Sequence, residues 1–430
     1  MDHHTYAHKL RLEGTGEWLL RKPKFDQWYR AEESSVLWLC GGIGVGKTIL
    51  VSKVVDHFLS NACYGQSLAY FYCQRGTNEP KRSIPSEILC SIVKQLAFNE
   101  TTQTLIKPVG NSYDERAKKG FARGSFDIEE STDLILKMSE LIPSMIIVID
   151  ALDEVDPDRR HELLQAFENI CSTASNPVKL FVSSRNDTDI RTMLEGSLNL
   201  FIDATDSCGD IETFVVKEVK TVIKRKRLIG GKVSPELENL VVQTLIGRAE
   251  GMFRWVQLQI ELICNAKHIK RDPDVRSALG KLPATLKESY EQIYSQILEL
   301  EPPSRVIAER VLSWLLCAKR LLSVHELLAA ICVGWDEKPD PVEESDLLDL
   351  CFNLVVTDKS SDSFRLAHLS VREYLEMRPE FTTLNTNILA AERCVTTWRM
   401  KFPHNDRFYT YSSFYMLEHC QSPSLFIIIR

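Results

Sequence analysis

The stretch Gly41-Gly42-Ile43-Gly44-Val45-Gly46-Lys47-Thr48 decides the fold. A glycine, four residues and then Gly-Lys-Thr match the phosphate-binding loop. The apolar run 36–40 before the loop is typical of a buried strand, and apolar residues recur at helical spacing over 49–59 after it. Strand, loop and helix together predict that backbone N–H groups and the positive helix end bind a triphosphate. We therefore expect Lys47 to reach the β- and γ-phosphates and the Thr48 hydroxyl to bind Mg²⁺, rather than a chance glycine-rich turn.

A strand that ends in acidic residues is the second feature that indicates a nucleotide site. The apolar, mostly β-branched run 145–149 ends at Asp150. An aspartate at the carboxyl end of a buried strand beside a phosphate loop is placed to hold Mg²⁺ through its water shell. Asp153 and Glu154 follow, and either carboxylate is expected to orient or deprotonate the attacking water. Alone the pattern is weak, because many strands end in aspartate, but in order behind a phosphate loop it is strong.

The remaining strands predict an open sheet. The run 179–184 ends at Arg185, which would emerge at the edge where ligands of open α/β sheets bind. There it can read the γ-phosphate as a bidentate donor, with a surface ion pair as the alternative. Further strands are expected over 67–73 and 198–202, and a polar surface excursion over 100–126. Strands and helices that alternate in this way predict an α/β fold with a five-stranded, parallel, doubly wound sheet.

The C-terminal half is predicted to be helical. Apolar spacing predicts four helices, over 211–223, 235–247, 253–264 and 286–300. Winged-helix order is expected next: helices over 305–320, from 323 and over 347–351, a hairpin over 354–368, and a helix capped by Ser370. Such domains often bind DNA, but these helices lack a basic face. The basic run 224–227 suits a solvated helix end, so nucleic acid is not an expected partner.

These patterns divide the chain into parts. They are a lead-in over 1–13, a nucleotide-binding domain over 14–205, a helical domain over 206–300, a winged-helix domain over 301–378, and a further helical region over 379–430 that ends abruptly, as in a truncated chain. The lead-in contains His3, His4 and His8. We interpret them as part of a mobile polar tail rather than as a metal cluster.

The composition narrows the class of protein. The chain has 430 residues, a net charge of −7 and 44% hydrophobic residues, as expected for a globular protein of several domains. No apolar run approaches the roughly 18 residues that cross a bilayer, and the N-terminus lacks the apolar core of a signal peptide. The twelve cysteines form no Cys-x-x-Cys pair. This usage indicates reduced thiols in a cytoplasmic protein and no structural zinc site.

Taken in order, the motifs resemble a known family. They are the phosphate loop, Asp150-Ala151-Leu152-Asp153-Glu154, Ser183-Ser184-Arg185, and the segments 14–19, 250–255 and 366–375. This set resembles the NACHT class of STAND signal-transduction NTPases, and in detail the fungal NLR-like and heterokaryon-incompatibility type. The resemblance covers about residues 11–380.

The resemblance implies a nucleotide-driven switch. In that family the nucleotide-binding, helical and winged-helix domains close over ADP, and exchange for ATP opens the molecule and drives self-association. For this chain it implies ATP/ADP and Mg²⁺ as cofactors and a role in self/non-self recognition or innate-immunity-like signalling, with effector and ligand proteins that the sequence does not identify. It also implies that His368 contacts the ADP β-phosphate and that Thr15 and Gly16 lie near the adenine.

Some features depart from the family. Gly251-Met252-Phe253 occupies the place of a Gly-x-Pro turn that packs on the base in many relatives. No guanine-selecting Asn-Lys-x-Asp motif follows the fourth strand, which favours ATP and leaves GTP open. Neither an N-terminal effector nor C-terminal repeats are visible. Two other functions stay open: a conventional turnover ATPase, such as a kinase or motor, and a non-hydrolysing scaffold fragment.

Overall fold

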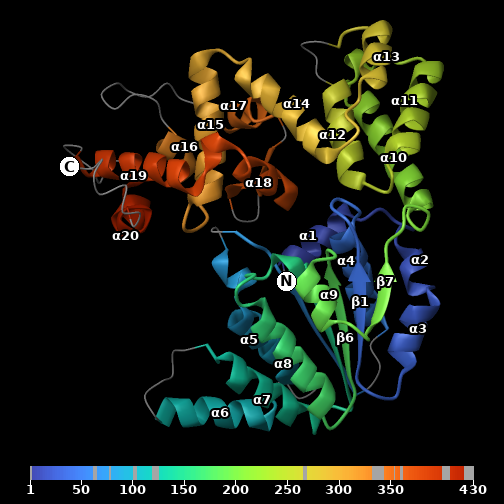
Figure 1. Ribbon diagram of the computed structural model, residues 1–430, viewed down its shortest axis with the longest axis vertical. Helices are drawn as coiled ribbons and strands as arrows, with labels where there is room; N and C mark the ends of the chain where they lie inside the picture. The colour runs from blue at the N-terminus through green and yellow to red at the C-terminus, as the bar shows by residue number, and fades with distance from the viewer. Residues whose placement is uncertain are drawn as a thin grey trace. The chain divides into compact units, whose positions relative to one another are not determined.

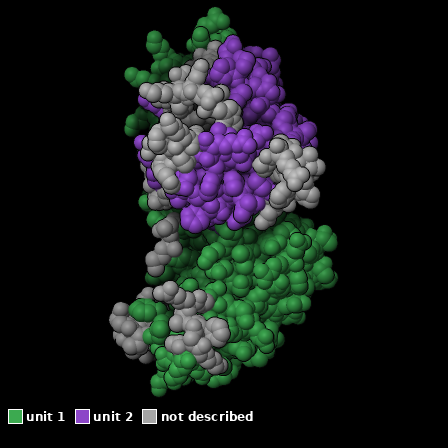
Figure 2. Space-filling view, turned by 90° about the vertical axis from the view of Figure 1, so that its left-hand side faces the viewer, with its two compact units in different colours: residues 1–75, 80–260, 266–274 green, residues 76–79, 261–265, 275–430 purple. Residues whose placement is uncertain are grey.

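The computed structural model places most of the chain in two compact units. It describes residues 2–61, 65–76, 79–99, 104–118, 125–264, 269–331, 343–352, 354–358, 362–399 and 407–420. Figure 2 colours the two units: unit 1 holds residues 1–75, 80–260 and 266–274, and unit 2 holds residues 76–79, 261–265 and 275–430. Each unit has its own core and is described by itself.

Unit 1 is built on a five-stranded parallel sheet (Figure 1). Its strands are β1 (Ser35–Cys40), β2 (Gln66–Tyr72), β5 (Ser144–Asp150), β6 (Val178–Ser184) and β7 (Leu198–Phe201). Their order across the sheet is β2-β5-β6-β1-β7, and every neighbouring pair is parallel. The predicted α/β fold is therefore confirmed. The carboxyl ends of all five strands lie along one edge.

Helices cover both faces of the sheet. They are α1 (Asp2–Leu10), α2 (Glu17–Leu20), α3 (Pro23–Arg30), α4 (Lys47–Ser60), α5 (Pro85–Leu96), α7 (Ile128–Ser139), α8 (Arg160–Thr173) and α9 (Thr188–Met193). The side chains of β5 alternate between two cores, because successive residues of a strand point to opposite faces. Ile147 packs with α5, α7 and α8, whereas Ile146 and Val148 pack with α3 and α4. This arrangement is the doubly wound one.

Two segments of unit 1 differ from the sequence-based expectation. The stretch expected as a polar excursion contains helix α6 (Lys107–Lys118) and part of a small hairpin, β3 (Phe98–Asn99) and β4 (Thr104–Leu105); residues 100–103 and 119–124 lie outside the described residues. Val109 on α6 is buried against the sheet's core, which explains why this segment is ordered.

The N-terminal lead-in is the second difference. Helix α1 packs on α4, and two of its side chains, together with that of Arg11 just after it, contact Asp56 of α4. Oδ1 of Asp56 lies 3.1 Å from His4 Nε2, and Oδ2 lies 2.7 Å from His8 Nδ1 and 2.6 Å from Arg11 Nη2. His4 is buried and its Nδ1 lies 2.9 Å from the Tyr72 hydroxyl. The interpretation as a mobile tail is wrong, because the polar residues of this segment form hydrogen bonds and ion pairs with the Asp56 carboxylate.

Three helices lead from the sheet towards the second half of the chain. They are α10 (Cys208–Lys224), α11 (Pro235–Arg248) and α12 (Phe253–Ile263), and the unpredicted α13 (Asp272–Gly280) follows them. Helix α10 ends at Lys224, one residue beyond the predicted range 211–223. By contact, α10, α11 and most of α12 belong to unit 1 with the sheet.

Unit 2 contains the winged-helix elements and the helices that flank them. They are α14 (Leu286–Leu298), α15 (Pro302–Cys317), α16 (Val324–Ile331), α17 (Glu344–Leu350), the antiparallel pair β8 (Val355–Asp358) and β9 (Ser363–Leu366), α18 (Leu369–Glu376), α19 (Thr383–Arg399) and α20 (Tyr409–His419). A capping box starts α16, because the side chains of Ser323 and Glu326 each accept a hydrogen bond from the other residue's backbone N–H. Ser370, however, does not cap α18. His368 does, because its Nδ1 accepts from the Ser370 N–H at 3.1 Å.

Within the described part of the chain, no helix combines the length and the apolar character needed to cross a bilayer. Residues 421–430, which include the apolar end of the chain, lie outside that part.

Candidate nucleotide site

The phosphate loop joins β1 to α4 as predicted. Gly46 has φ +89° and precedes the first turn of α4, a left-handed conformation that favours glycine. A side chain on Gly41 would come within 2.9 Å of Ile202 and Val45, so the loop also needs glycine there for space. The ammonium nitrogen of Lys47 lies 2.8 Å from the carbonyl oxygens of both Gly41 and Gly42. Burial lowers the pKa of this ammonium, although nearby carboxylates oppose the effect.

Asp150 ends the central strand β5 and is almost fully buried. Its Oδ1 accepts a hydrogen bond from Ser183 Oγ at 2.6 Å, and the carboxylate also accepts one from the Thr48 hydroxyl. Ser183 Oγ in turn accepts from the Ala151 N–H at 3.0 Å. Burial raises the pKa of Asp150, and the hydrogen bonds oppose that shift. The structure thus brings Thr48 and Asp150, the two predicted metal ligands, into direct contact.

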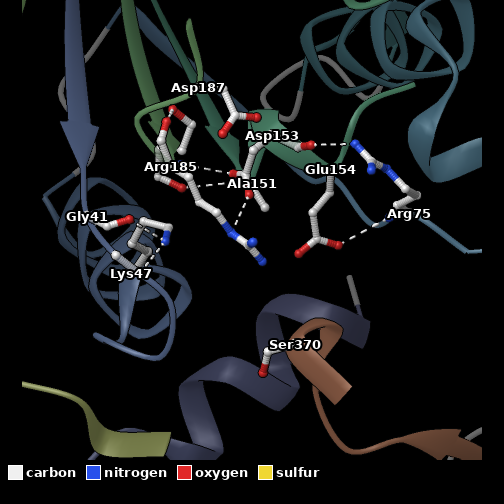
Figure 3. A network of polar contacts seen from close by, with 12 residues as sticks. Gly41, Lys47, Arg75, Ala151, Asp153, Glu154, Arg185, Asp187 and Ser370 are labelled. Carbon is white, nitrogen blue, oxygen red and sulfur yellow. Dashed lines mark hydrogen bonds and ion pairs between the residues drawn. The ribbon is translucent and has the colours of Figure 1, made fainter. Parts of the chain in front are cut away.

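Asp153 and Arg185 form an ion pair at the same edge (Figure 3). Oδ1 of Asp153 accepts from the Arg185 backbone N–H at 3.2 Å, and Oδ2 lies 3.1 Å from Arg185 Nε. The Asp153 side chain is 6% exposed and the Arg185 side chain 21% exposed. The alternative weighed for Arg185, an ion pair, is present, but it lies within the site and not on the open surface.

Glu154 lies beside this ion pair, and burial changes the pKa of its carboxyl group. Its Oε2 accepts a hydrogen bond from the Arg75 backbone N–H at 3.2 Å (Figure 3). Burial raises the pKa of Glu154 to about 8, with the charge of Asp153 as the next cause. A carboxyl group with this pKa is mostly protonated at pH 7, and only its ionised fraction accepts a proton from water.

Two arginines that the sequence did not indicate hold this turn. Arg75 Nη2 and Arg160 Nη2 donate to the main-chain oxygen of Asp153 at 2.9 Å and 2.6 Å. Arg160 is 3% exposed, and its Nη1 pairs with Asp189 at 2.8 Å. The strand order explains Arg75, because β2 borders β5 and a residue after β2 reaches the acids that follow β5. The strand order is not readable from sequence.

The start of helix α12 contacts the phosphate loop. The Arg254 N–H donates to the Gly44 carbonyl oxygen at 3.2 Å, and a side chain on Gly46 would meet the Phe253 ring at 3.4 Å. The Phe253 ring in turn packs edge-on against Phe214 of α10, with centroids 5.4 Å apart. Gly251-Met252-Phe253, at the start of α12, therefore adjoins the phosphate loop.

The segment predicted near the adenine is held by a residue that the sequence did not indicate. Asp210 Oδ2 accepts from the Gly16 N–H at 2.9 Å and from Trp18 Nε1 at 3.1 Å. Burial raises the pKa of this carboxyl group. The Thr15 hydroxyl donates to the Leu12 carbonyl oxygen at 2.7 Å. These bonds place Thr15 and Gly16 beside the first turn of α10, within unit 1.

His368 lies in unit 2, and its predicted contact with nucleotide stays a prediction. Its Nδ1 accepts from the Ser370 N–H and lies 2.7 Å from Ser370 Oγ. Ser370 Oγ is also 2.7 Å from the Tyr290 hydroxyl. An Nδ1 that accepts leaves the proton of the neutral ring on Nε2.

The residues present fit a magnesium ion. Among the described residues no group of three or more His, Cys, Asp or Glu side chains could hold a metal ion. Thr48 and Asp150 instead offer one hydroxyl and one carboxylate, both hard oxygen donors. Mg²⁺ is usually bound in this way, with one or two protein ligands, and phosphate and water complete its shell.

Two families and two curated proteins match parts of this chain. Residues 14–185 match the family described as Nephrocystin 3, N-terminal, and residues 298–383 match the winged-helix domain of GPI inositol-deacylase. The chain is 25% identical over 374 residues to the vegetative incompatibility protein HET-E-1 of Podospora anserina, a match that covers 83% of this chain and 26% of that protein. It is 34% identical over 110 residues to the azaphilone pigments biosynthesis cluster protein L of Monascus ruber, a match that covers 23% of each.

The chain thus spans about a quarter of the length of the curated relatives that it matches. Two solved structures are similar at low identity. The Walker-type ATPase PABY2304 of Pyrococcus abyssi matches 82% of this chain and 94% of its own (13% identity, TM-score 0.34). The ADP form of the Aeropyrum pernix ORC2 protein matches 89% and 95% (16% identity, TM-score 0.37).

Proposed function

We propose that this chain, which resembles the NACHT-type NTPases of the fungal incompatibility class, is a nucleotide-dependent molecular switch that binds ATP and ADP and hydrolyses ATP slowly. The observation that supports this most is the joint position of the phosphate loop and the acids after β5 at one edge of a parallel sheet, where Thr48 already contacts Asp150. The proposal extends to a cytoplasmic protein that self-associates in its ATP state and acts in self/non-self recognition through partner proteins.

The loop supplies phosphate binding. The backbone N–H groups of 41–46 and the first turn of α4 present partial positive charge, and Lys47 adds a full charge. In the structure Lys47 is bonded to two loop carbonyls, so binding replaces these bonds by stronger ones to phosphate. Thr48 and Asp150 would hold Mg²⁺, which when bound neutralises charge on the β- and γ-phosphates.

Hydrolysis needs an acceptor for one proton. A water oxygen forms a bond to the γ-phosphorus, the bond to the β–γ bridging oxygen breaks, and ADP leaves with that electron pair. Asp153 or Glu154 takes the proton of the water, while Arg185 donates to the γ-phosphate oxygens. No second-substrate motif accompanies these groups in the sequence, which favours a switch over a kinase or a motor.

The contact between α12 and the phosphate loop supports the switching part of the proposal. Arg254 and Phe253 touch Gly44 and Gly46, so the helical segment can respond to what the loop holds. A ligand shifts a conformational equilibrium only through contacts that differ between two states, and this contact lies where such a difference would arise.

The test is the identity of the nucleotide that copurifies with the protein, combined with its turnover rate. Protein purified in Mg²⁺ is denatured, and the released nucleotide is separated by ion-exchange chromatography. Retained ADP, with turnover far below the typical ~10 s⁻¹ of enzymes, supports the switch. Retained GDP would shift the assignment to GTP. Fast turnover would indicate a conventional ATPase, and no binding of ATP, ADP or GTP at millimolar concentration would leave a scaffold and overturn the proposal.

A further inference from the structure

Two acids follow β5, and their surroundings assign them different tasks. Both carboxylate oxygens of Asp153 are used by one residue, since Oδ1 accepts from the Arg185 N–H at 3.2 Å and Oδ2 pairs with Arg185 Nε at 3.1 Å. An acid that serves as a proton acceptor for water needs an oxygen lone pair aimed at that water. Each oxygen keeps a second lone pair, but a proton taken up there would neutralise the charge that pairs with Arg185.

The main chain makes such a movement costly. The carbonyl oxygen of Asp153 is held by Arg75 at 2.9 Å and by Arg160 at 2.6 Å, and Arg160 is itself paired with Asp189. Asp153 also lies in the single turn 152–154, which Ala151 enters with φ +56°. Main chain and side chain are therefore fixed together, with the carboxylate 6% exposed.

The same bonds fix Arg185 next to the phosphate lysine. Arg185 follows β6, and the phosphate loop follows the neighbouring parallel strand β1; the Gly41 N–H donates to the Ser184 carbonyl oxygen at 3.2 Å where the two strands end. A guanidinium held in place by a buried carboxylate does not have to be ordered when the nucleotide arrives. Charge stabilisation of this preorganised kind is the most effective in a site that excludes water.

Glu154 is held more loosely. Its Oε2 accepts a hydrogen bond from the Arg75 backbone N–H at 3.2 Å, and Glu154 is partly exposed whereas Asp153 is buried. It belongs to the same turn and lies beside Asp153 (Figure 3).

We propose that Asp153 is a positioning residue that holds Arg185 towards the γ-phosphate, and that Glu154 alone accepts the proton of the attacking water. The proposal rests on the proposed nucleotide binding and deepens it, because it makes Asp153 a determinant of the preference for ATP over ADP. Loss of Asp153 then acts through Arg185, on binding of the γ-phosphate as well as on hydrolysis.

The experiment is a double-mutant cycle of Asp153→Asn and Arg185→Ala, read as the ratio of the dissociation constants for ADP and for a non-hydrolysable ATP analogue. Asp153→Asn keeps the main-chain carbonyl that Arg75 and Arg160 hold, so the turn is preserved. A positioning role predicts that each single variant lowers the ATP preference about ten- to a hundredfold, as expected for a lost charged hydrogen bond, and that the double variant is no worse than Arg185→Ala. Asp158→Asn, an exposed neighbour, is the matched control.

Two results would overturn the proposal. One is an unchanged ATP-to-ADP preference in folded Asp153→Asn, with hydrolysis lost, which is the behaviour of a proton acceptor. The other is additive loss in the double variant, which would show that the two residues act independently. The parent protein is titrated with nucleotide before any variant is compared. If the parent binds no nucleotide, the result contradicts the proposed function and not the roles of Asp153 and Glu154.

Discussion

The ammonium nitrogen of Lys47 lies 2.8 Å from the carbonyl oxygen of Gly41, six residues earlier in the same loop. Lys47→Ala should therefore leave the fold intact, because water can satisfy the loop carbonyls, yet raise the dissociation constant for ATP and ADP more than about a hundredfold through loss of a charged phosphate contact. Titration with a fluorescent ATP analogue measures this, with circular dichroism as a check of folding. Lys94→Ala, at an exposed position of α5, should bind as the parent does. Equal affinity of parent and Lys47→Ala would refute the phosphate site.

Glu154→Gln should separate hydrolysis from binding. The amide cannot accept the proton of water, so we expect the turnover rate to fall about a hundred- to ten-thousandfold, while ATP binding changes only a few-fold. Single-turnover hydrolysis and equilibrium binding, measured on the same preparation, give the two quantities. Glu129→Gln on the exposed side of α7 is the control. Turnover at the parent rate in Glu154→Gln would remove Glu154 from the mechanism.

His368 can be tested for more than its local role as a helix cap. His368→Leu removes both the cap and the ring, whereas His368→Asn keeps a capping side chain, and loss of a cap costs about 0.5–2 kcal/mol of stability. If the ring contacts the ADP β-phosphate, both variants should release ADP faster, by about tenfold or more, and only His368→Leu should melt clearly earlier. ADP dissociation rates and melting curves decide this. Parent-like ADP release in His368→Asn would leave His368 with its capping role only.

The buried His419 makes the stability of unit 2 depend on pH. Its Nε2 accepts from the Tyr411 hydroxyl at 2.8 Å and its Nδ1 lies 2.8 Å from Asn387 Oδ1. Burial lowers the pKa of His419 to about 3, with a smaller effect from the charge of Lys319. The unfolded chain, with a histidine pKa of about 6.5, then binds a proton that the folded chain does not.

This difference in proton binding means that unit 2 becomes less stable as the pH falls. The ring is neutral in both states above pH about 6.5, and its contribution to stability is lost as the pH falls towards about 3, by about 1.4 kcal/mol per unit. Between pH 7.5 and pH 5.0 the parent should therefore lose about 2 kcal/mol that His419→Gln does not lose. Urea unfolding of both proteins at the two pH values measures this difference in the free energy of unfolding. The carboxylates are the same in both proteins, so their contributions to the pH dependence cancel. Equal losses in parent and variant would contradict the assignment.

Sequence was sufficient for the sheet and for the phosphate side of the site. The unbroken apolar run before Asp150 can only be a buried strand, and the parallel topology then places Asp150 beside the loop. The network around Asp153 was not predictable. It depends on β2 and β6 flanking β5, which brings Arg75 and Arg185 to the acids from opposite sides. Asp210 was missed for a similar reason, because its partner Gly16 is 194 residues away in the chain.

Predictions for polar residues were wrong where their hydrogen-bonding partners are distant in the sequence or belong to the backbone. The histidines near the N-terminus resemble a solvated tail in sequence, since nothing local satisfies them, and only the packing of α1 on α4 supplies Asp56. His368 was expected to follow the hairpin and leave the cap to Ser370. The structure gives the cap to the imidazole, because its Nδ1 reaches the Ser370 N–H.

Docking of α1 on α4 has a practical consequence for how the protein is produced. The family match begins at residue 14, so a shortened protein trimmed to that boundary would lack the helix that carries His4 and His8. Asp56 would then lose its partners, and Tyr72 at the end of β2 would lose the cover of a buried ring. A shortened protein should therefore keep helix α1, and a purification tag is better attached through a spacer than fused directly to this helix.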